Sequence, residues 1–202
     1  PRAYWLLFVG LFFIVFTYAS IAKIYPDWIK GIPLSQWLEA KKDSSFAFLY
    51  AGKQPLIMAW GGIFFDLLII PAFLWKRTRN LAFFASLYFH LMNSITFQIG
   101  TFPYMMIGAA VLFYPAEKLR KWFKMNKVYD TAESTPLKNS NLLAYAVALF
   151  LLVQIVLPLR HLAIPGNVFW TEEGHRLSWR MMLRSKGGTA YFDITLPDGK
   201  SV

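Results

Sequence analysis

The chain has 202 residues, of which 56% are hydrophobic and 18% aromatic, and its mean hydropathy is +0.40. Only 16% of the residues are charged, against about 25% in a typical soluble domain, so the composition excludes a disordered chain and an ordinary soluble domain. The net charge of +10 then suits membrane orientation and anionic head groups rather than nucleic acid. The absence of cysteine excludes disulfides, cysteine-ligated metals and a cysteine nucleophile within this chain.

Four apolar segments are long enough to cross a bilayer as helices, which takes about 20 residues. They are residues 4–22, 56–75, 81–99 and 142–159. Residues 101–114 are also apolar but shorter, so they form either a short span or a re-entrant segment. The first segment is too aromatic for a signal peptide and lacks a small-residue cleavage site. The predicted fold class is therefore mainly α, a polytopic helical membrane protein.

The end of the chain has a different pattern. Residues 191–196 (YFDITL) alternate with the period of a strand, and residues 197–199 (PDG) are typical of a hairpin turn. We therefore expect a transmembrane helical domain over residues 1–163 and an outward-facing segment over residues 164–202 that begins a small β-rich domain. The chain starts without Met and ends inside the predicted hairpin, which suggests a piece of a larger protein.

Two basic segments predict the orientation in the membrane. They are residues 76–79 (KRTR) and 117–127 (EKLRKWFKMNK). The positive-inside rule places both in the cytoplasm, which requires residues 101–114 to carry the chain back across the bilayer. We expect an interfacial helix with tryptophan anchors over residues 25–55. In this orientation it faces outward, to the periplasm or lumen, and so does the chain after His161.

Ionisable groups at membrane depth are costly, so each is a candidate functional residue. Lys23 follows the first span. Either its side chain snorkels to the interface, or apolar surroundings favour a neutral amine that can serve as a base. Asp66 is the only acid within a predicted span, and the simpler interpretation makes it the partner of a nearby lysine or histidine.

A polar stripe is predicted on one face of the third span. His90 lies within this span, and Asn93, Ser94 and Phe97 follow it at helical spacing. The stripe is either interhelical hydrogen-bonding glue or the polar wall of a pocket.

Several polar groups converge on one end of the predicted bundle. Lys23, the turn at residues 98–104 and His161 all lie toward the outward leaflet in the orientation above. This convergence indicates one outward-facing site. The three histidines lie on separate segments and do not have the spacing of a metal motif.

The segment that follows the last span is rich in arginine, methionine and tryptophan. Arg176, Arg180 and Arg184 recur at every fourth residue, so we expect them to share one face of a short helix. That face is either a solvated or head-group-facing strip or part of a site. Met181 and Met182, beside Trp179, either belong to the core or contact a flat apolar ligand.

Several separated motifs make the chain resemble a known family. They are residues 18–23 (YASIAK) with Asp27, Trp28 and Gly31, residues 89–94 (FHLMNS), residues 99–102 (IGTF), residues 157–161 (LPLRH) and residues 178–182 (SWRMM). In this order they resemble the vitamin K-dependent γ-glutamyl carboxylases and the related HTTM membrane proteins. The resemblance implies a helical membrane domain followed by a β-rich outward domain.

The resemblance also implies an activity, that of a carbon–carbon lyase type carboxylase. Such enzymes oxidise vitamin K hydroquinone with O2 to the epoxide, and couple this to removal of a γ-proton from peptidyl glutamate and uptake of CO2. The expected cofactor is reduced vitamin K, with O2 and CO2 as co-substrates. The expected partners are a glutamate-containing protein or peptide, membrane lipids, and the N-terminal helices and C-terminal domain that this segment lacks, but no nucleic acid.

Individual residues take expected roles from the same resemblance. Lys23 matches the family's catalytic lysine and would take the hydroquinone proton. His90 matches a pocket histidine that would hydrogen-bond the quinone head or polarise an intermediate. The remaining expected cofactor-binding residues are Asn93, His161, His175, Trp179, Met181 and Met182. No metal site is implied.

The chain also departs from the animal members of the family. Ala22 stands where they have a second lysine, His175 lies close to where they have a tyrosine, and their many cysteines are absent. The absence of cysteine suggests a microbial relative. A microbial protein is expected in a bacterial inner membrane, and a eukaryotic one in the endoplasmic reticulum. Another active-site histidine of the family belongs to an earlier helix, so this segment is not expected to act alone.

Two alternative functions stay open at this point. One is a quinone- or lipid-binding HTTM membrane protein without glutamate carboxylation, which is either an epoxidase only or non-catalytic. The other is a helical scaffold within a larger membrane complex.

Overall fold

A computed structural model describes residues 2–39, 43, 47, 52–97, 99–124 and 140–180. The helices among these residues follow in chain order. They are α1 (Arg2–Ala22), α2 (Pro26–Ile29), α3 (Ile32–Glu39), α4 (Gln54–Leu74), α5 (Arg79–Phe97), α6 (Phe102–Val111), α7 (Ala116–Trp122), α8 (Ser140–Val156), the 3-10 helix η2 (Leu157–Ala163) and α9 (Val168–Thr171). The expectation of a mainly helical chain is confirmed for this part of the protein.

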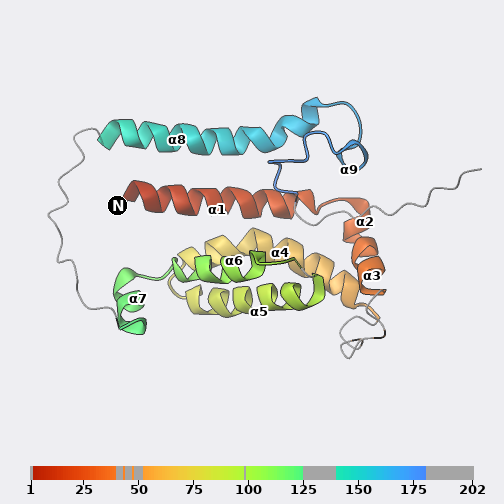
Figure 1. Cartoon of the computed structure of the whole chain (residues 1–202), viewed down its shortest axis with the longest axis horizontal. Helices are drawn as coiled ribbons and strands as arrows, with labels where there is room; N and C mark the ends of the chain where they lie inside the picture. The colour runs from red at the N-terminus through yellow and green to blue at the C-terminus, as the bar shows by residue number, and fades with distance from the viewer. Residues whose placement is uncertain are drawn as a thin grey trace, which may run out of the picture.

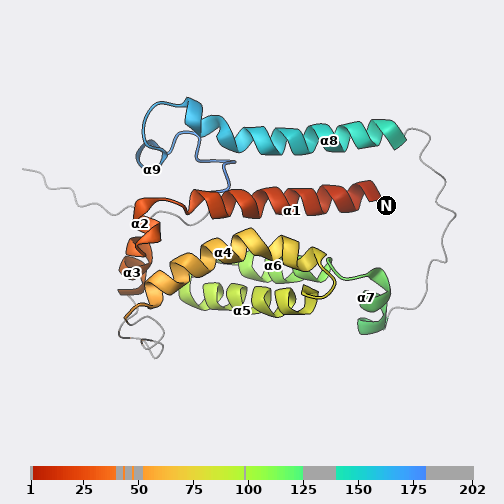
Figure 2. The same ribbon diagram turned by 180° about the vertical axis from the view of Figure 1, so that it is seen from behind.

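The body of the bundle consists of helices that run along a common direction, namely α1, α4, α5, α6 and α8 (Figures 1 and 2). Helix α1 packs on α4 on one side and on α8 on the other, while α5 packs on both α4 and α6. Helix α8 lies at the edge of the bundle. Only 6% of the residues in its apolar stretch are buried, so the helix is mostly exposed. Its leucine, valine and isoleucine side chains therefore suit contact with lipid or with other helices.

Three helical segments are long and apolar enough to cross a membrane: Ala3–Ala22, Gln54–Leu74 and Asn141–Ala163. They confirm the first, second and last predicted spans. The third predicted span, residues 81–99, forms α5 but is not among them, because Arg79, Asn80 and His90 lower the hydropathy of this helix. The short apolar segment forms α6, whose ten residues return the chain along α5.

A hydrophobic core joins α1, α4, α5 and α6. Its buried residues are Val9, Phe16, Ile69, Ile70, Phe73, Ala82, Met106, Ala110 and Phe113. Aromatic rings make many of the contacts, and the Phe73 and Phe113 rings stack with centroids 4.8 Å apart. Large rings bury much apolar surface, so this cluster fixes how the four helices lie against one another.

A second core anchors the segment after α1. Trp28, Leu34 and Leu38 of α2 and α3 pack on Ala59 and Ile63 of α4, and the indole Nε1 of Trp28 donates a hydrogen bond to the Ala59 carbonyl (3.1 Å). The expected single interfacial helix is therefore wrong: two short helices meet at a bend. Gly31 forms the bend with φ +72°, where an added Cβ would lie 3.1 Å from the backbone of Leu56.

The bundle has two chemically different ends. The basic turn between α4 and α5 and the basic helix α7 lie at one end, whereas α2, α3, η2 and α9 lie at the other (Figures 1 and 2). Tyr114, just before α7, donates a hydrogen bond to the Asn80 side chain at the start of α5 (2.9 Å). The return of the chain along α6 thus brings both basic segments to one end, as the orientation argument requires.

The segment after the last span does not form the expected arginine-bearing helix. Helix α9 ends at Thr171, and residues 172–180 form turns in which Glu172, Leu177 and Trp179 have φ near +60°. A helix cannot continue through such left-handed residues, so Arg176 and Arg180 do not share a helical face. Arg184, the predicted hairpin and the expected β-rich domain lie outside the described residues.

Candidate functional site

Lys23 and Asp66 form an ion pair between the end of α1 and the middle of α4. The lysine amine also donates a hydrogen bond to the Ala19 carbonyl (3.2 Å). The two side chains are 12% and 7% exposed, so both charges lie largely out of water. The predicted partner of Asp66 is therefore confirmed as a lysine.

The register of α1 against α4 places this pair. Ser20, one turn before Lys23, is 1% exposed and donates a hydrogen bond to the Ile63 carbonyl of α4 (3.0 Å). The lysine side chain passes next to Gly62, where an added Cβ would lie in ordinary van der Waals contact with its Cε, at 3.9 Å. The Lys23 amine also lies over the Trp28 ring, 5.9 Å from its centroid.

His90 lies deep in the bundle and makes no hydrogen bond through Nδ1 within the described part of the chain. Its side chain is 3% exposed. The imidazole meets the Phe65 and Phe89 rings edge-on, with centroids 5.8 and 5.5 Å away. An unpaired buried nitrogen does not fit the hydrogen-bonding glue that the sequence left open.

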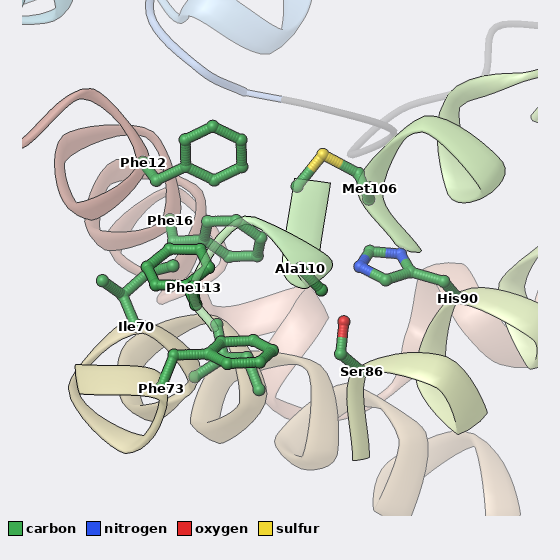
Figure 3. Close-up of a pocket in the computed structure, with 10 residues that line it drawn as sticks. Phe12, Phe16, Ile70, Phe73, Ser86, His90, Met106, Ala110 and Phe113 are labelled. Carbon is green, nitrogen blue, oxygen red and sulfur yellow. The ribbon is translucent and has the colours of Figure 1, made fainter. Parts of the chain in front are cut away.

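The His90 side chain borders a small, partly open pocket (Figure 3). Phenylalanines of α1 and α4, together with Phe113, line one side, and Ser86, His90 and Met106 line the other. Its volume is about 10 Å³, which is about the space of one water molecule. Sites for drug-sized ligands have about 300–1,000 Å³, so this cavity does not hold a naphthoquinone in the conformation described.

The other members of the predicted polar stripe lie nearer the outward end of α5. Asn93 is half-buried. Ser94 donates a hydrogen bond to the Tyr104 hydroxyl of α6 (2.9 Å), so this serine does act as interhelical glue. Gln98, which opens the predicted outward turn, lies outside the described residues.

His161 pairs with an arginine from the segment that follows α9. Its Nδ1 lies 2.7 Å from the Pro158 carbonyl, and its Nε2 lies 2.9 Å from a terminal nitrogen of Arg180. A neutral imidazole protonated on Nδ1 satisfies both contacts, because Nδ1 then donates and Nε2 accepts. His161 therefore fixes the direction of the guanidinium.

Aromatic contacts connect this pair to the lysine. The Arg180 guanidinium lies 5.2 Å from the Phe169 ring centroid, the Phe169 ring lies 4.7 Å from that of Tyr25, and Tyr25 lies 6.4 Å from Trp28. Trp28 in turn lies beneath the Lys23 amine. A continuous cluster therefore runs from His161 to Lys23 at the end of the bundle opposite the basic segments (Figure 1), and we call it the outward cluster after the predicted orientation.

Burial perturbs two groups of this cluster. Burial raises the pKa of the Tyr25 phenol, and the nearby Asp27 carboxylate raises it further, while Arg180 acts in the opposite direction. Burial also lowers the pKa of Arg180, with Tyr25 opposing that shift. The guanidinium stays charged, because an arginine cannot be deprotonated in a protein, but it has lost part of its hydration.

The remaining predicted site residues are only partly placed. His175 is half-buried, and its carbonyl accepts a hydrogen bond from the Ser178 hydroxyl. Trp179 has a buried indole nitrogen without a hydrogen-bond partner among the described residues. Met181 and Met182 lie outside the described residues.

The structure therefore unites some of the predicted residues and separates others. Lys23 and His161 belong to the outward cluster, whereas His90 borders the small pocket and is not part of that cluster. The contribution of Phe169 was not predicted, because a single phenylalanine in the four-residue helix α9 belongs to no sequence motif. No group of three or more potential metal ligands occurs among the described residues.

Comparison with known families covers most of the chain. Residues 2–118 match the model of the HTTM domain. Residues 139–201 match the model of the vitamin K-dependent gamma-carboxylase, lumenal domain. No solved structure matches the chain.

Proposed function

We propose a function from the premise that this chain belongs to the HTTM and vitamin K-dependent γ-carboxylase family, a family of membrane proteins whose cofactor is vitamin K. On this proposal the protein is an integral membrane γ-glutamyl carboxylase. It couples oxidation of vitamin K hydroquinone to its epoxide with carboxylation of peptidyl glutamate. O2 and CO2 are its co-substrates.

The Lys23–Asp66 pair carries this proposal. An ammonium group has no lone pair, so Lys23 accepts a proton only when its own proton has passed to Asp66. The transfer gives a neutral amine beside a neutral carboxylic acid. Because two opposite charges are expensive to keep in apolar surroundings, the neutral form of the pair is accessible where water is excluded. The low exposure of both side chains supports this condition.

The outward cluster offers groups that suit a flat quinol. Aromatic rings of Tyr25, Trp28 and Phe169 offer apolar faces, and the Trp179 indole offers a buried donor without a partner among the described residues. Bound vitamin K hydroquinone supplies the reducing equivalents for O2 and, through its oxidation, the strong base for the glutamate. His161, His175, Trp179 and Asn93, with Met181 and Met182, are the proposed binding residues.

His90 takes a separate proposed role. Its unpaired Nδ1 is available for a hydrogen bond, but the cavity beside it is too small for the quinol ring. A quinol reaches His90 only if side chains that line the pocket move. The proposed orientation places the basic end of the bundle in the cytoplasm and the Lys23 end toward the periplasm or lumen, in a bacterial inner membrane if the protein is microbial.

The decisive experiment uses the full-length protein in lipid. A glutamate-containing peptide is incubated with it, with reduced vitamin K and with bicarbonate, and is analysed by mass spectrometry for the mass of one added CO2. Epoxide is measured in the same reaction, and a peptide with glutamine in place of glutamate is the matched control. The proposal predicts both products, and a reaction without added CO2 on the glutamate peptide contradicts it.

The second candidate function is a protein of the same family that binds quinone or lipid without carboxylating glutamate. The same experiment distinguishes it from the carboxylase. Epoxide without carboxylated peptide identifies an epoxidase only. Binding of reduced vitamin K with neither product identifies a non-catalytic member of the family.

A further inference from the structure

The outward cluster contains a guanidinium that has no acidic partner among the described residues. Arg180 donates one hydrogen bond, to the neutral nitrogen of His161. Its Nε is buried and has no hydrogen-bond partner in the described part of the chain. The ion pair formed among the described residues is that of Lys23 with Asp66. A buried charged donor without an acceptor is unfavourable, so Arg180 is suited to bind an anion.

The surroundings hold this guanidinium in one direction. His161 accepts from one terminal nitrogen, and the Phe169 ring lies against the guanidinium at 5.2 Å. Gly174 packs against His161, where an added Cβ would lie 2.8 Å from the His161 Cβ. Arg180 is therefore oriented before any ligand arrives, which lowers the entropy lost on binding.

We propose that Arg180 binds the side-chain carboxylate of the glutamate residue in a peptide substrate, with His161 as its positioning residue. This inference rests on the proposed function. A guanidinium offers coplanar N–H donors that match the two oxygens of a carboxylate. A lipid phosphate is the alternative anion, and the comparison of peptides with vesicles below distinguishes the two.

The position of Arg180 also assists the chemistry of the proposed reaction. When the Cγ–H bond breaks, the proton passes to the strong base that quinol oxidation supplies. The electron pair stays on Cγ, spreads into the adjacent carboxylate, and then forms the bond to CO2. The carboxylate gains negative charge in this step, and a guanidinium already aligned with its oxygens stabilises that charge. The aromatic contacts through Phe169, Tyr25 and Trp28 connect this position to the Lys23 end of the cluster.

Peptide binding to the cofactor-free, full-length protein tests the inference without relying on catalysis. The probes are one peptide with glutamate and the same peptide with glutamine. We expect Arg180→Gln to raise the Kd of the glutamate peptide about ten- to a hundredfold and to leave that of the glutamine peptide unchanged. Arg180→Lys keeps the charge but lacks the coplanar N–H donors of the guanidinium. Its Kd for the glutamate peptide therefore lies between those of the wild type and Arg180→Gln. Arg176→Gln is the matched control, because Arg176 is exposed in the same segment, and its Kd stays unchanged.

Kinetics of the loaded enzyme provide a second measurement. Arg180→Gln raises the KM of the glutamate peptide, whereas Arg176→Gln leaves it unchanged. The inference is overturned if Arg180→Gln prefers the glutamate peptide over the glutamine peptide as strongly as the wild type does. It is also overturned if Arg180→Gln loses only the binding of vesicles with anionic phospholipid. If the wild type prefers the glutamate peptide and Arg180→Gln does not, but no carboxylated product forms, the proposed function is contradicted and this inference is supported.

Discussion

Lys23 and Asp66 are 43 positions apart in the sequence and meet as a largely buried ion pair between α1 and α4. Each charge makes the other tolerable at a depth where neither is well hydrated. The pair therefore has two separable consequences. It contributes to how α1 docks on α4, and it supplies the proposed base with a neighbour that can hold its proton.

The structural consequence predicts a strong coupling between the two residues. Lys23→Met or Asp66→Leu alone leaves an uncompensated buried charge, so each lowers the free energy of unfolding by about 3–5 kcal/mol. The double variant removes both charges and recovers most of that loss. Chemical unfolding of the full-length protein in detergent, followed through a double-mutant cycle, measures the coupling. Strictly additive losses contradict it.

The chemical consequence is tested by a substitution that keeps the ion pair. In Lys23→Arg the guanidinium still pairs with Asp66 but cannot be deprotonated. We expect near wild-type stability together with a fall in epoxide formation of about 10²–10⁴-fold, the usual contribution of a general base. Lys23→Ala lacks the amine altogether and is equally inactive. Epoxide formed at the normal rate by either variant refutes the assignment of Lys23 as the base.

His90 gives a prediction of the opposite sign for stability. Its buried Nδ1 has no partner in the described part of the chain, and an unsatisfied buried polar atom costs about 1–3 kcal/mol. His90→Leu replaces the imidazole with an apolar side chain among Phe65, Phe89 and Met106. We therefore expect the free energy of unfolding to be unchanged or higher, while quinol-dependent activity falls. A marked loss of stability in thermal unfolding instead supports hydrogen-bonding glue.

Gly174 gives a local prediction about the outward segment. It has φ +69°, and an added Cβ would lie 2.8 Å from the His161 Cβ. Gly174→Ala therefore strains the backbone and displaces His161, with an expected cost above about 1 kcal/mol. Limited proteolysis after Arg176 should become faster, while the stability of the membrane helices changes little. Gly61→Ala is the control, because no atom lies within 4 Å of an added Cβ there.

The sequence predicts the long apolar helices, but it does not predict contacts that arise only from the packing of the folded chain. Long apolar runs located α1, α4 and α8, and the cost of an isolated carboxylate indicated a partner for Asp66. Periodicity failed for Arg176 and Arg180 because positive φ at Leu177 and Trp179 breaks the helix. The roles assigned to the predicted site residues stay predictions.

The contact between His161 and Arg180 shows the same limit from another side. The two residues are 19 positions apart, and nothing in the local pattern brings the guanidinium back to the end of α8. The turns of residues 172–180 and the docking of Phe169 on Tyr25 do so. The sequence marks this segment as unusual but leaves Arg180 either on a solvated strip or in a site, because pairing across a loop has no periodic signal.

Tyr25 connects this cluster to the pH dependence of stability. Burial and the Asp27 carboxylate raise its pKa above the ordinary value of 10.0, so the folded protein binds the phenolic proton more tightly than the unfolded chain does. This contribution is fully present below about pH 10 and is lost as the pH rises through the higher pKa of the folded state. Tyr25→Phe should therefore lose less stability than the wild type between neutral and strongly alkaline pH.

In Arg180→Gln the nearby positive charge is gone, so Tyr25 should ionise at still higher pH. The tyrosinate absorbance that is absent from Tyr25→Phe measures the ionisation of Tyr25. Ionisation of Tyr25 at lower pH in Arg180→Gln contradicts the proximity of the two side chains.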